Sequence, residues 1–115
     1  MHLSGTSKLL RIFIGESDTI GHDYLYEKIV WLAKEKGMAG ATVSKGIMSF
    51  GASSHMHRAR LIELSEDLPV IIEMADAEEK INSFLPLLNE LMEQCGKGGL
   101  MTIEKIDVLY YQSKK

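Results

Sequence analysis

The strongest structural signal in this sequence is a long apolar stripe at helical spacing in its last third. Asp76, followed three residues later by Glu79, is typical of the start of a helix, and Pro86 predicts a bend within it. The glycine-rich run at 96–99 ends the pattern. We therefore expect a helix at about 77–95. Its stripe comprises Ile81, Phe84, Leu85, Leu88, Leu91, Met92 and Cys95.

A second apolar stripe, containing Leu25, Ile29 and Leu32, predicts a helix at 23–36 that Asp23 caps. Strand-like runs of β-branched and aromatic residues occupy 9–14, 41–51, 69–74 and 101–111, and a polar loop occupies 15–22. The resulting order, β-α-β-β-α-β, is typical of a ferredoxin-like α+β domain with a four-stranded antiparallel sheet and two helices on one face. We assign one domain to 8–111, with tails at 1–7 and 112–115.

The face of the sheet that the helices leave open is predicted to be partly apolar. Two helices cover one face only, so a monomer should show polar residues on the other. Instead, the open face is expected to carry Leu9 and Phe13 from the first strand and Leu109 from the last strand, while their neighbours in sequence face the helices. An exposed apolar patch usually marks an interface, so we expect a closed ring of identical subunits. The alternative is that some strands are out of phase.

Charge and cysteine content restrict the class of protein. The formal net charge is −3 and the calculated pI is about 5.8, without the basic stripe of a nucleic-acid binder. The single cysteine, Cys95, lies in the apolar stripe and has no partner for an internal disulfide, which favours a reducing compartment. No apolar run approaches the ~20 residues of a membrane span. We expect a cytoplasmic protein that binds no nucleic acid.

Two glycine-rich runs and a histidine pair are candidates for ligand binding. The runs at 46–54 and 96–99 are either phosphate-binding backbone turns or plain turns, and neither matches a Walker A or dinucleotide motif. His55 and His57 would face the same way in an extended segment and form a metal pair. No carboxylate or thiol stands at ligand spacing, so a solvated loop is the other interpretation. No nucleophile elbow accompanies Ser53 or Ser54, and we expect no enzymatic activity.

Five segments carry a family resemblance, and they lie at 11–16, 25–27, 40–43, 46–54 and 64–70. Together they resemble the PII nitrogen-signalling proteins, and more closely a PII-like family of unknown function. The resemblance covers about 8–111 and implies a trimer whose sheets face inward. It also implies nucleotides bound in clefts between subunits, and a loop, here 52–66, that meets a partner such as a membrane transporter or an enzyme.

The resemblance also implies which residues hold the nucleotide. The adenine would lie by the second strand and the edge of the third, and the phosphates between the loop base and the second glycine run. A lysine and two arginines found in PII proteins are not matched here, which predicts that AMP or ADP binds at least as well as ATP. The alternative function is a trimeric metal-binding protein using His55 and His57. The implied nucleotide-binding residues are Thr42, Phe50, Gly51, Ala52, Ser53, Ser54, Glu73, Ala75, Gly98 and Gly99.

Overall fold

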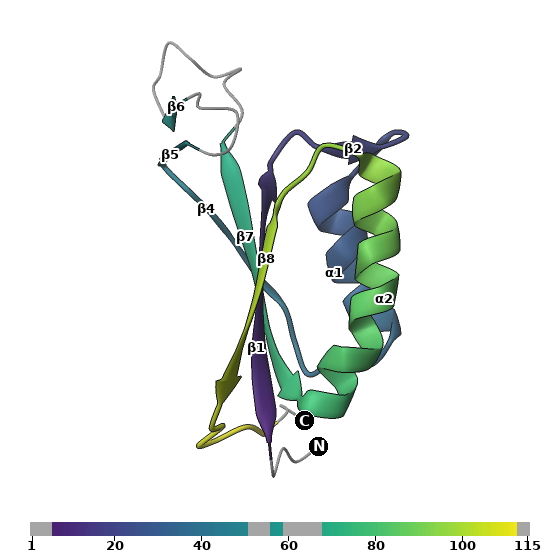
Figure 1. The fold of residues 1–115 in the computed structure, drawn as a ribbon, viewed down its shortest axis with the longest axis vertical. Helices are drawn as coiled ribbons and strands as arrows, with labels where there is room; N and C mark the ends of the chain where they lie inside the picture. The colour runs from purple at the N-terminus through teal and green to yellow at the C-terminus, as the bar shows by residue number, and fades with distance from the viewer. Residues whose placement is uncertain (1–5, 51–55, 59–67, 113–115) are drawn as a thin grey trace.

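Strand β1 (Ser7–Gly15) runs through the interior of a four-stranded antiparallel sheet of order β4-β7-β1-β8 (Figure 1). The other three strands are β4 (Thr42–Lys45), β7 (Pro69–Ala77) and β8 (Leu100–Ile106). The computed structural model describes residues 6–50, 56–58 and 68–112, with side chains described at 6–48 and 68–112. Because β1 and β7 each pair with a strand on both sides, β4 and β8 are the edge strands of the main sheet.

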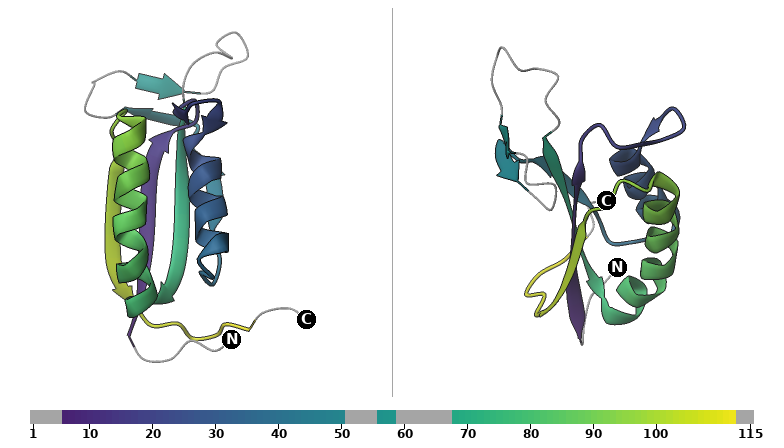
Figure 2. Two further views of the ribbon diagram at one scale, coloured as in Figure 1. Left: turned by 90° about the vertical axis from the view of Figure 1, so that its right-hand side faces the viewer. Right: turned by 45° about the horizontal axis from the view of Figure 1, so that its top comes forward.

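Two helices, α1 (Leu25–Glu35) and α2 (Glu78–Cys95), cover one face of this sheet (Figure 2). The order of the main elements along the chain is β1-α1-β4-β7-α2-β8, which confirms the predicted ferredoxin-like α+β fold. Helix α2 continues through Pro86. None of the helices in the described residues is long and apolar enough to cross a membrane.

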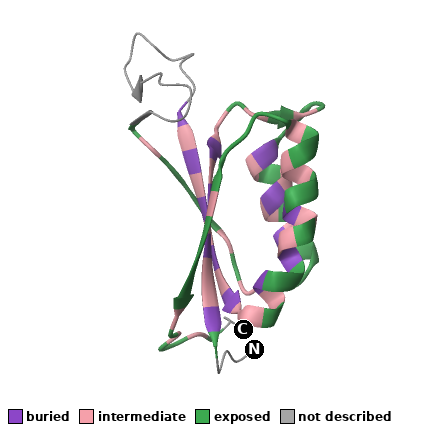
Figure 3. Cartoon of the chain, viewed as in Figure 1, coloured by how far each residue is buried: buried purple, intermediate pink, exposed green. Residues whose placement is uncertain are grey.

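The hydrophobic core lies between the sheet and the two helices. Alternate residues of β1 and β7 point toward the helices and are buried, as the banding of these strands in Figure 3 shows. From α2, Ile81, Phe84 and Leu88 fill the same layer, as the apolar stripe predicts. Full burial of such a side chain contributes about 1.5–3 kcal/mol. The buried strand residues are Leu10, Ile12, Ile14, Val70, Ile72 and Met74.

Both helices begin later than the sequence predicts. Asp23 belongs to β3 (Asp23–Tyr24), which pairs with β2 (Thr19–Ile20) in a small hairpin where a loop extending to residue 22 was expected. Asp76 belongs to β7, because pairing with β1 continues as far as Ala77. Its carboxylate is buried and accepts hydrogen bonds from the backbone N–H of Ala39 (2.8 Å) and of Ala77 (2.7 Å). Asp76 thus joins the segment before β4 to the end of β7.

The prediction of one continuous second strand at 41–51 is wrong. Strand β4 ends at Lys45, and β5 (Met48–Phe50) then pairs with β6 (Met56–Arg58) in a separate hairpin. Gly46 lies between them, and a Cβ added there would approach Pro69 Cγ to 2.6 Å. The absence of a Cβ at Gly46 therefore allows the chain to pass close to Pro69, whose carbonyl accepts a 2.8 Å hydrogen bond from the Gly46 N–H.

The last strand is shorter than predicted, since β8 ends at Ile106 opposite Ser7, the first residue of β1. Residues 107–111 therefore have no strand partner in β1. Leu109 is 95% exposed and does not lie on the open face of the sheet, contrary to the prediction. The segment instead crosses the end of the sheet, and the Tyr111 hydroxyl donates a hydrogen bond to the Ala39 carbonyl (3.1 Å) (Figure 2).

Candidate functional site

The open face of the sheet combines apolar and charged residues. Strand register places Leu9 and Phe13 of β1 on this face with Ile71 and Ala75 of β7, and all four are half-buried. Leu100 of β8 lies opposite Phe13 on the same face and is 57% exposed. The predicted apolar residues on both faces of β1 and β7 are thus present. A surface of this kind is suited to covering by another molecule.

Three charged side chains cross the middle of this face and form what we call the Arg11 triad. The Arg11 guanidinium lies 3.0 Å from the Glu73 carboxylate on β7 and 3.1 Å from the Glu104 carboxylate on β8. The hydrogen bond with Glu73 raises the pKa of Arg11; partial desolvation opposes this effect, and the negative charge of Glu104 adds to it. Arg11 therefore remains a cation between two carboxylates.

At the β4 edge, the structure brings together three of the predicted nucleotide-binding residues. Thr42 pairs with Glu73 across β4 and β7, and Ala75 lies two residues further along the same face. Thr42 is exposed, and the Glu73 carboxylate is held by Arg11. We call these three residues the β4-edge half-site.

At the opposite edge, Gly98 and Gly99 precede β8 and form the β8-edge half-site. Gly98 has φ +80°, and a Cβ there would meet no atom within 4 Å, so its backbone borders open space. Gly99 has φ +157°, and a Cβ there would approach the Phe13 carbonyl oxygen and Met92 Cε to 2.9 Å each. Glycine is therefore favoured by the backbone conformation at Gly98 and required for close packing on β1 at Gly99.

Thr42 lies on edge strand β4 and its two companions lie on the adjacent strand β7, whereas Gly98 and Gly99 lead into the opposite edge strand, β8. Strands β7 and β1 stand between β4 and β8, so the edges are three inter-strand spacings apart, or about 14 Å. The described part of a single chain therefore does not bring the β4-edge half-site against the β8-edge half-site. A cleft that uses both requires a neighbouring subunit.

The structure does not describe the side chains of the remaining predicted nucleotide-binding residues, and the role of the whole set stays a prediction. Phe50 ends β5, where its backbone pairs with Met56, and its side chain is not described. Gly51, Ala52, Ser53 and Ser54 lie outside the described residues, as does most of the predicted regulatory loop at 52–66.

The histidine pair is likewise untested. His55 lies outside the described residues, and the backbone of His57 pairs with Ser49 in the β5–β6 hairpin. Within the described ranges, no group of three or more His, Cys, Asp and Glu side chains could hold a metal ion. The metal-binding alternative therefore remains a prediction.

Two contacts in this region were not predicted from the sequence. The Arg11 triad joins three strands, and only the strand register shows that Glu73 and Glu104 both reach Arg11. The contact of Tyr111 with Ala39 brings the C-terminal segment beside the start of β4. Alternation along β1 does place Arg11 on the open face, but it does not identify its partners.

The order of the main elements along the chain, the strand order of the sheet and the two helices on one face define a ferredoxin-like α+β protein. Within this class, the chain belongs to the family DUF190, described as "Uncharacterized ACR, COG1993", whose sequence model matches residues 7–108. A UPF0166 protein of Aquifex aeolicus is 38% identical over 104 residues, covering 90% of this chain and 93% of the relative. The predicted resemblance to a PII-like family of unknown function is confirmed.

Solved structures with the same fold have much lower sequence identity. CPII, a nitrogen regulatory PII-like protein from Thiomonas intermedia K12 solved with ADP, AMP and bicarbonate, is 20% identical, with a TM-score of 0.67. The match covers 90% of this chain and 89% of CPII. The divalent ion tolerance protein CutA1 from Ehrlichia chaffeensis is 13% identical over 92% of this chain and 84% of its own, with a TM-score of 0.52. These similarities establish the fold.

Proposed function

We propose that this protein is a non-catalytic regulator that binds an adenine nucleotide in a cleft between two subunits of a homotrimer. The nucleotide would contact the β4-edge half-site of one subunit and the β8-edge half-site of the next. The predicted loop at 52–66 would then alter a partner protein, such as a membrane transporter or an enzyme. Such coupling requires that the loop favour different states with and without the ligand.

The observation that carries this proposal is the separation of the two half-sites. Thr42 lies on edge strand β4 beside Glu73 of β7, and the Gly98–Gly99 pair precedes the strand at the other edge. A closed ring of subunits brings opposite edges of neighbouring sheets together and covers the open faces at the same time. The half-buried Leu9, Phe13 and Ile71 on that face support this arrangement.

The proposed ligand is AMP or ADP rather than ATP. CPII, with the same fold, was solved with ADP and AMP. In this chain, Leu100 and Met101 follow the glycines, so the lysine that PII proteins offer to the outer phosphates is not matched. A charge-assisted hydrogen bond contributes about 1.5–3 kcal/mol, so the loss of one costs roughly ten- to a hundredfold in affinity.

Two measurements on the purified protein test this proposal. Mass spectrometry of the small molecules released by denaturation should identify AMP or ADP, and light scattering should give three times the chain mass. A stable monomer at micromolar concentration would contradict the assembly. Release of a bound metal from untagged protein, without any nucleotide, would favour the alternative that uses His55 and His57.

We place the protein in the cytoplasm because Cys95 is its only cysteine and a reducing compartment suits a free thiol. The thiol is half-buried in α2, which fits a packing role. Localisation of a fluorescent fusion in cells of the source organism would test this placement.

A further inference from the structure

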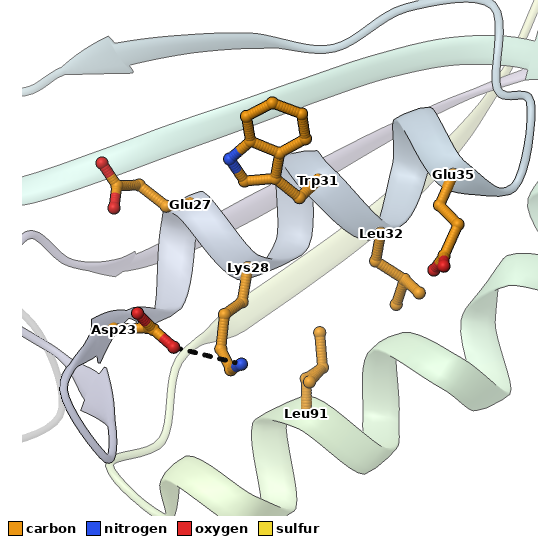
Figure 4. A pocket seen from close by; sticks show the side chains of 7 residues that line it. All are labelled: Asp23, Glu27, Lys28, Trp31, Leu32, Glu35 and Leu91. Carbon is orange, nitrogen blue, oxygen red and sulfur yellow. Dashed lines mark hydrogen bonds and ion pairs between the residues drawn. The ribbon is translucent and has the colours of Figure 1, made fainter.

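A groove between α1 and α2 lies on the outer side of the helix layer, away from the open face of the sheet (Figure 4). Its volume is about 520 Å³, and its floor contains Leu32 of α1 and Leu91 of α2, both half-buried. In a trimer whose sheets face inward, this helix layer faces outward. The groove is therefore accessible in either a monomer or the proposed trimer.

Trp31, the only tryptophan of the chain, projects from α1 at the side of the groove (Figure 4). Its side chain is 66% exposed and does not belong to the hydrophobic core. The Lys34 ammonium lies 5.5 Å from its ring centroid, a weak cation–π contact at an exposed site. Tryptophan is over-represented among the residues that dominate binding energy at protein interfaces.

The charges around the groove are mainly negative. Glu27 and Glu35 lie one turn before and one turn after Trp31 on α1, and neither forms an ion pair with a described residue. Lys28 is the only cation among the lining residues, and it already pairs with Asp23 (3.5 Å). Glu35 also lies in the last turn of α1, where the helix dipole favours a cation. A cationic ligand would pair with these two carboxylates and would also place a positive charge near the C-terminal end of α1.

We propose that this groove binds a basic amphipathic helix of a partner protein. An aliphatic side chain of that helix would pack on Leu32 and Leu91 beside Trp31, and lysines or arginines would pair with Glu27 and Glu35. These two carboxylates are eight residues apart, or about 12 Å along α1. A ligand must therefore carry two cations about two helical turns apart, which suits a helix in a groove better than a small cation.

The test uses a 14-residue amphipathic peptide of leucine and lysine, with lysines two turns apart, and a counterpart with glutamate in place of lysine. Trp31 reports binding directly because it is the only tryptophan. The lysine peptide should produce a saturable blue shift of its emission, and the glutamate peptide should not. A Glu27→Gln/Glu35→Gln variant should bind the lysine peptide about three- to tenfold more weakly, since exposed ion pairs contribute little each.

A Glu90→Gln/Glu93→Gln variant is the matched control, because it removes two exposed carboxylates from α2 that do not line the groove. It should retain the affinity of the unmodified protein. The proposal is overturned if the lysine peptide gives no saturable change up to millimolar concentration, if both peptides bind equally, or if both double variants weaken binding by the same factor. None of these outcomes depends on nucleotide binding, so the two proposals fail independently.

Discussion

Replacement of Arg11 by methionine should destabilise the assembled protein far more than an exposed ion pair can explain. In the isolated chain, the Arg11 side chain is 39% exposed, and those of Glu73 and Glu104 are 41% and 56% exposed. Exposed pairs of this kind contribute about 0–1 kcal/mol each. If the chain functions as a monomer, Arg11→Met should therefore lower the free energy of unfolding by no more than about 2 kcal/mol.

In the proposed trimer, the open face is covered, and the same substitution leaves two carboxylates without their cation. Removal of one partner from a buried ion pair costs about 3–5 kcal/mol, because the remaining charge is desolvated and unpaired. The loss should appear as dissociation as well as unfolding, because only the assembled protein buries the Arg11 triad. Urea unfolding at several protein concentrations, with light scattering on the same samples, measures both effects.

The control is Lys28→Met, which removes the ion pair with Asp23 on the outward-facing helix layer. This variant should change stability by less than about 1 kcal/mol and should not change the molecular mass. If Arg11→Met behaves like Lys28→Met in both measurements, the face that carries the triad is not buried, and the argument for assembly through this face fails.

Two substitutions and one ligand titration test other parts of the structure. Gly99→Ala should lower the free energy of unfolding by about 1–3 kcal/mol, since its Cβ would meet the Phe13 carbonyl at 2.9 Å. Gly40→Ala is the control and should cost almost nothing, because the space around Gly40 is open. Equal effects of the two substitutions in urea unfolding would refute the packing argument. Asp76→Ala should cost about 1.5–3 kcal/mol, because two backbone N–H groups lose a charged acceptor; a thermal midpoint that does not move would contradict this. Calorimetric titration should show that AMP or ADP binds at least as well as ATP, and a clear preference for ATP would show that other cations replace the unmatched lysine and arginines.

The fold could be predicted from the sequence because its main elements have strong periodic signals. The stripe from Ile81 to Cys95 identified α2, and the alternation of Leu10, Ile12 and Ile14 with Arg11 and Phe13 identified both faces of β1. Where local signals competed with long-range pairing, the sequence failed. Asp76 has the chemistry of a helix cap, yet β7 continues through it because β1 offers partners as far as Ser7.

The nucleotide-binding role of the predicted site residues stays a prediction. Motif resemblance proposed Thr42 and Glu73 for this role, and the register shows that the two residues are neighbours. It did not reveal that Arg11 holds the Glu73 carboxylate, because that contact depends on which strands are adjacent. The end of β8 was also missed, since the apolar residues Val108 and Leu109 continue the strand pattern after the pairing with β1 has ended.

The most direct test of a cleft shared between subunits is complementation by two variants that each damage one half-site. Thr42→Trp places a bulky ring at the β4 edge, where Thr42 is exposed. Gly98→Asp adds a negative charge at the β8 edge, where the backbone borders open space and where aspartate tolerates a positive φ. Each variant alone should form trimers that do not bind AMP.

The decisive measurement is calorimetric titration of AMP into protein assembled from equal amounts of the two variants. In a closed ring with a cleft between each pair of neighbours, random assembly restores both intact half-sites in about one quarter of the clefts. The mixed trimers should bind AMP with normal affinity at about one quarter of the normal stoichiometry. If the mixture binds no AMP although unmodified trimers do, the two half-sites do not form one cleft between subunits.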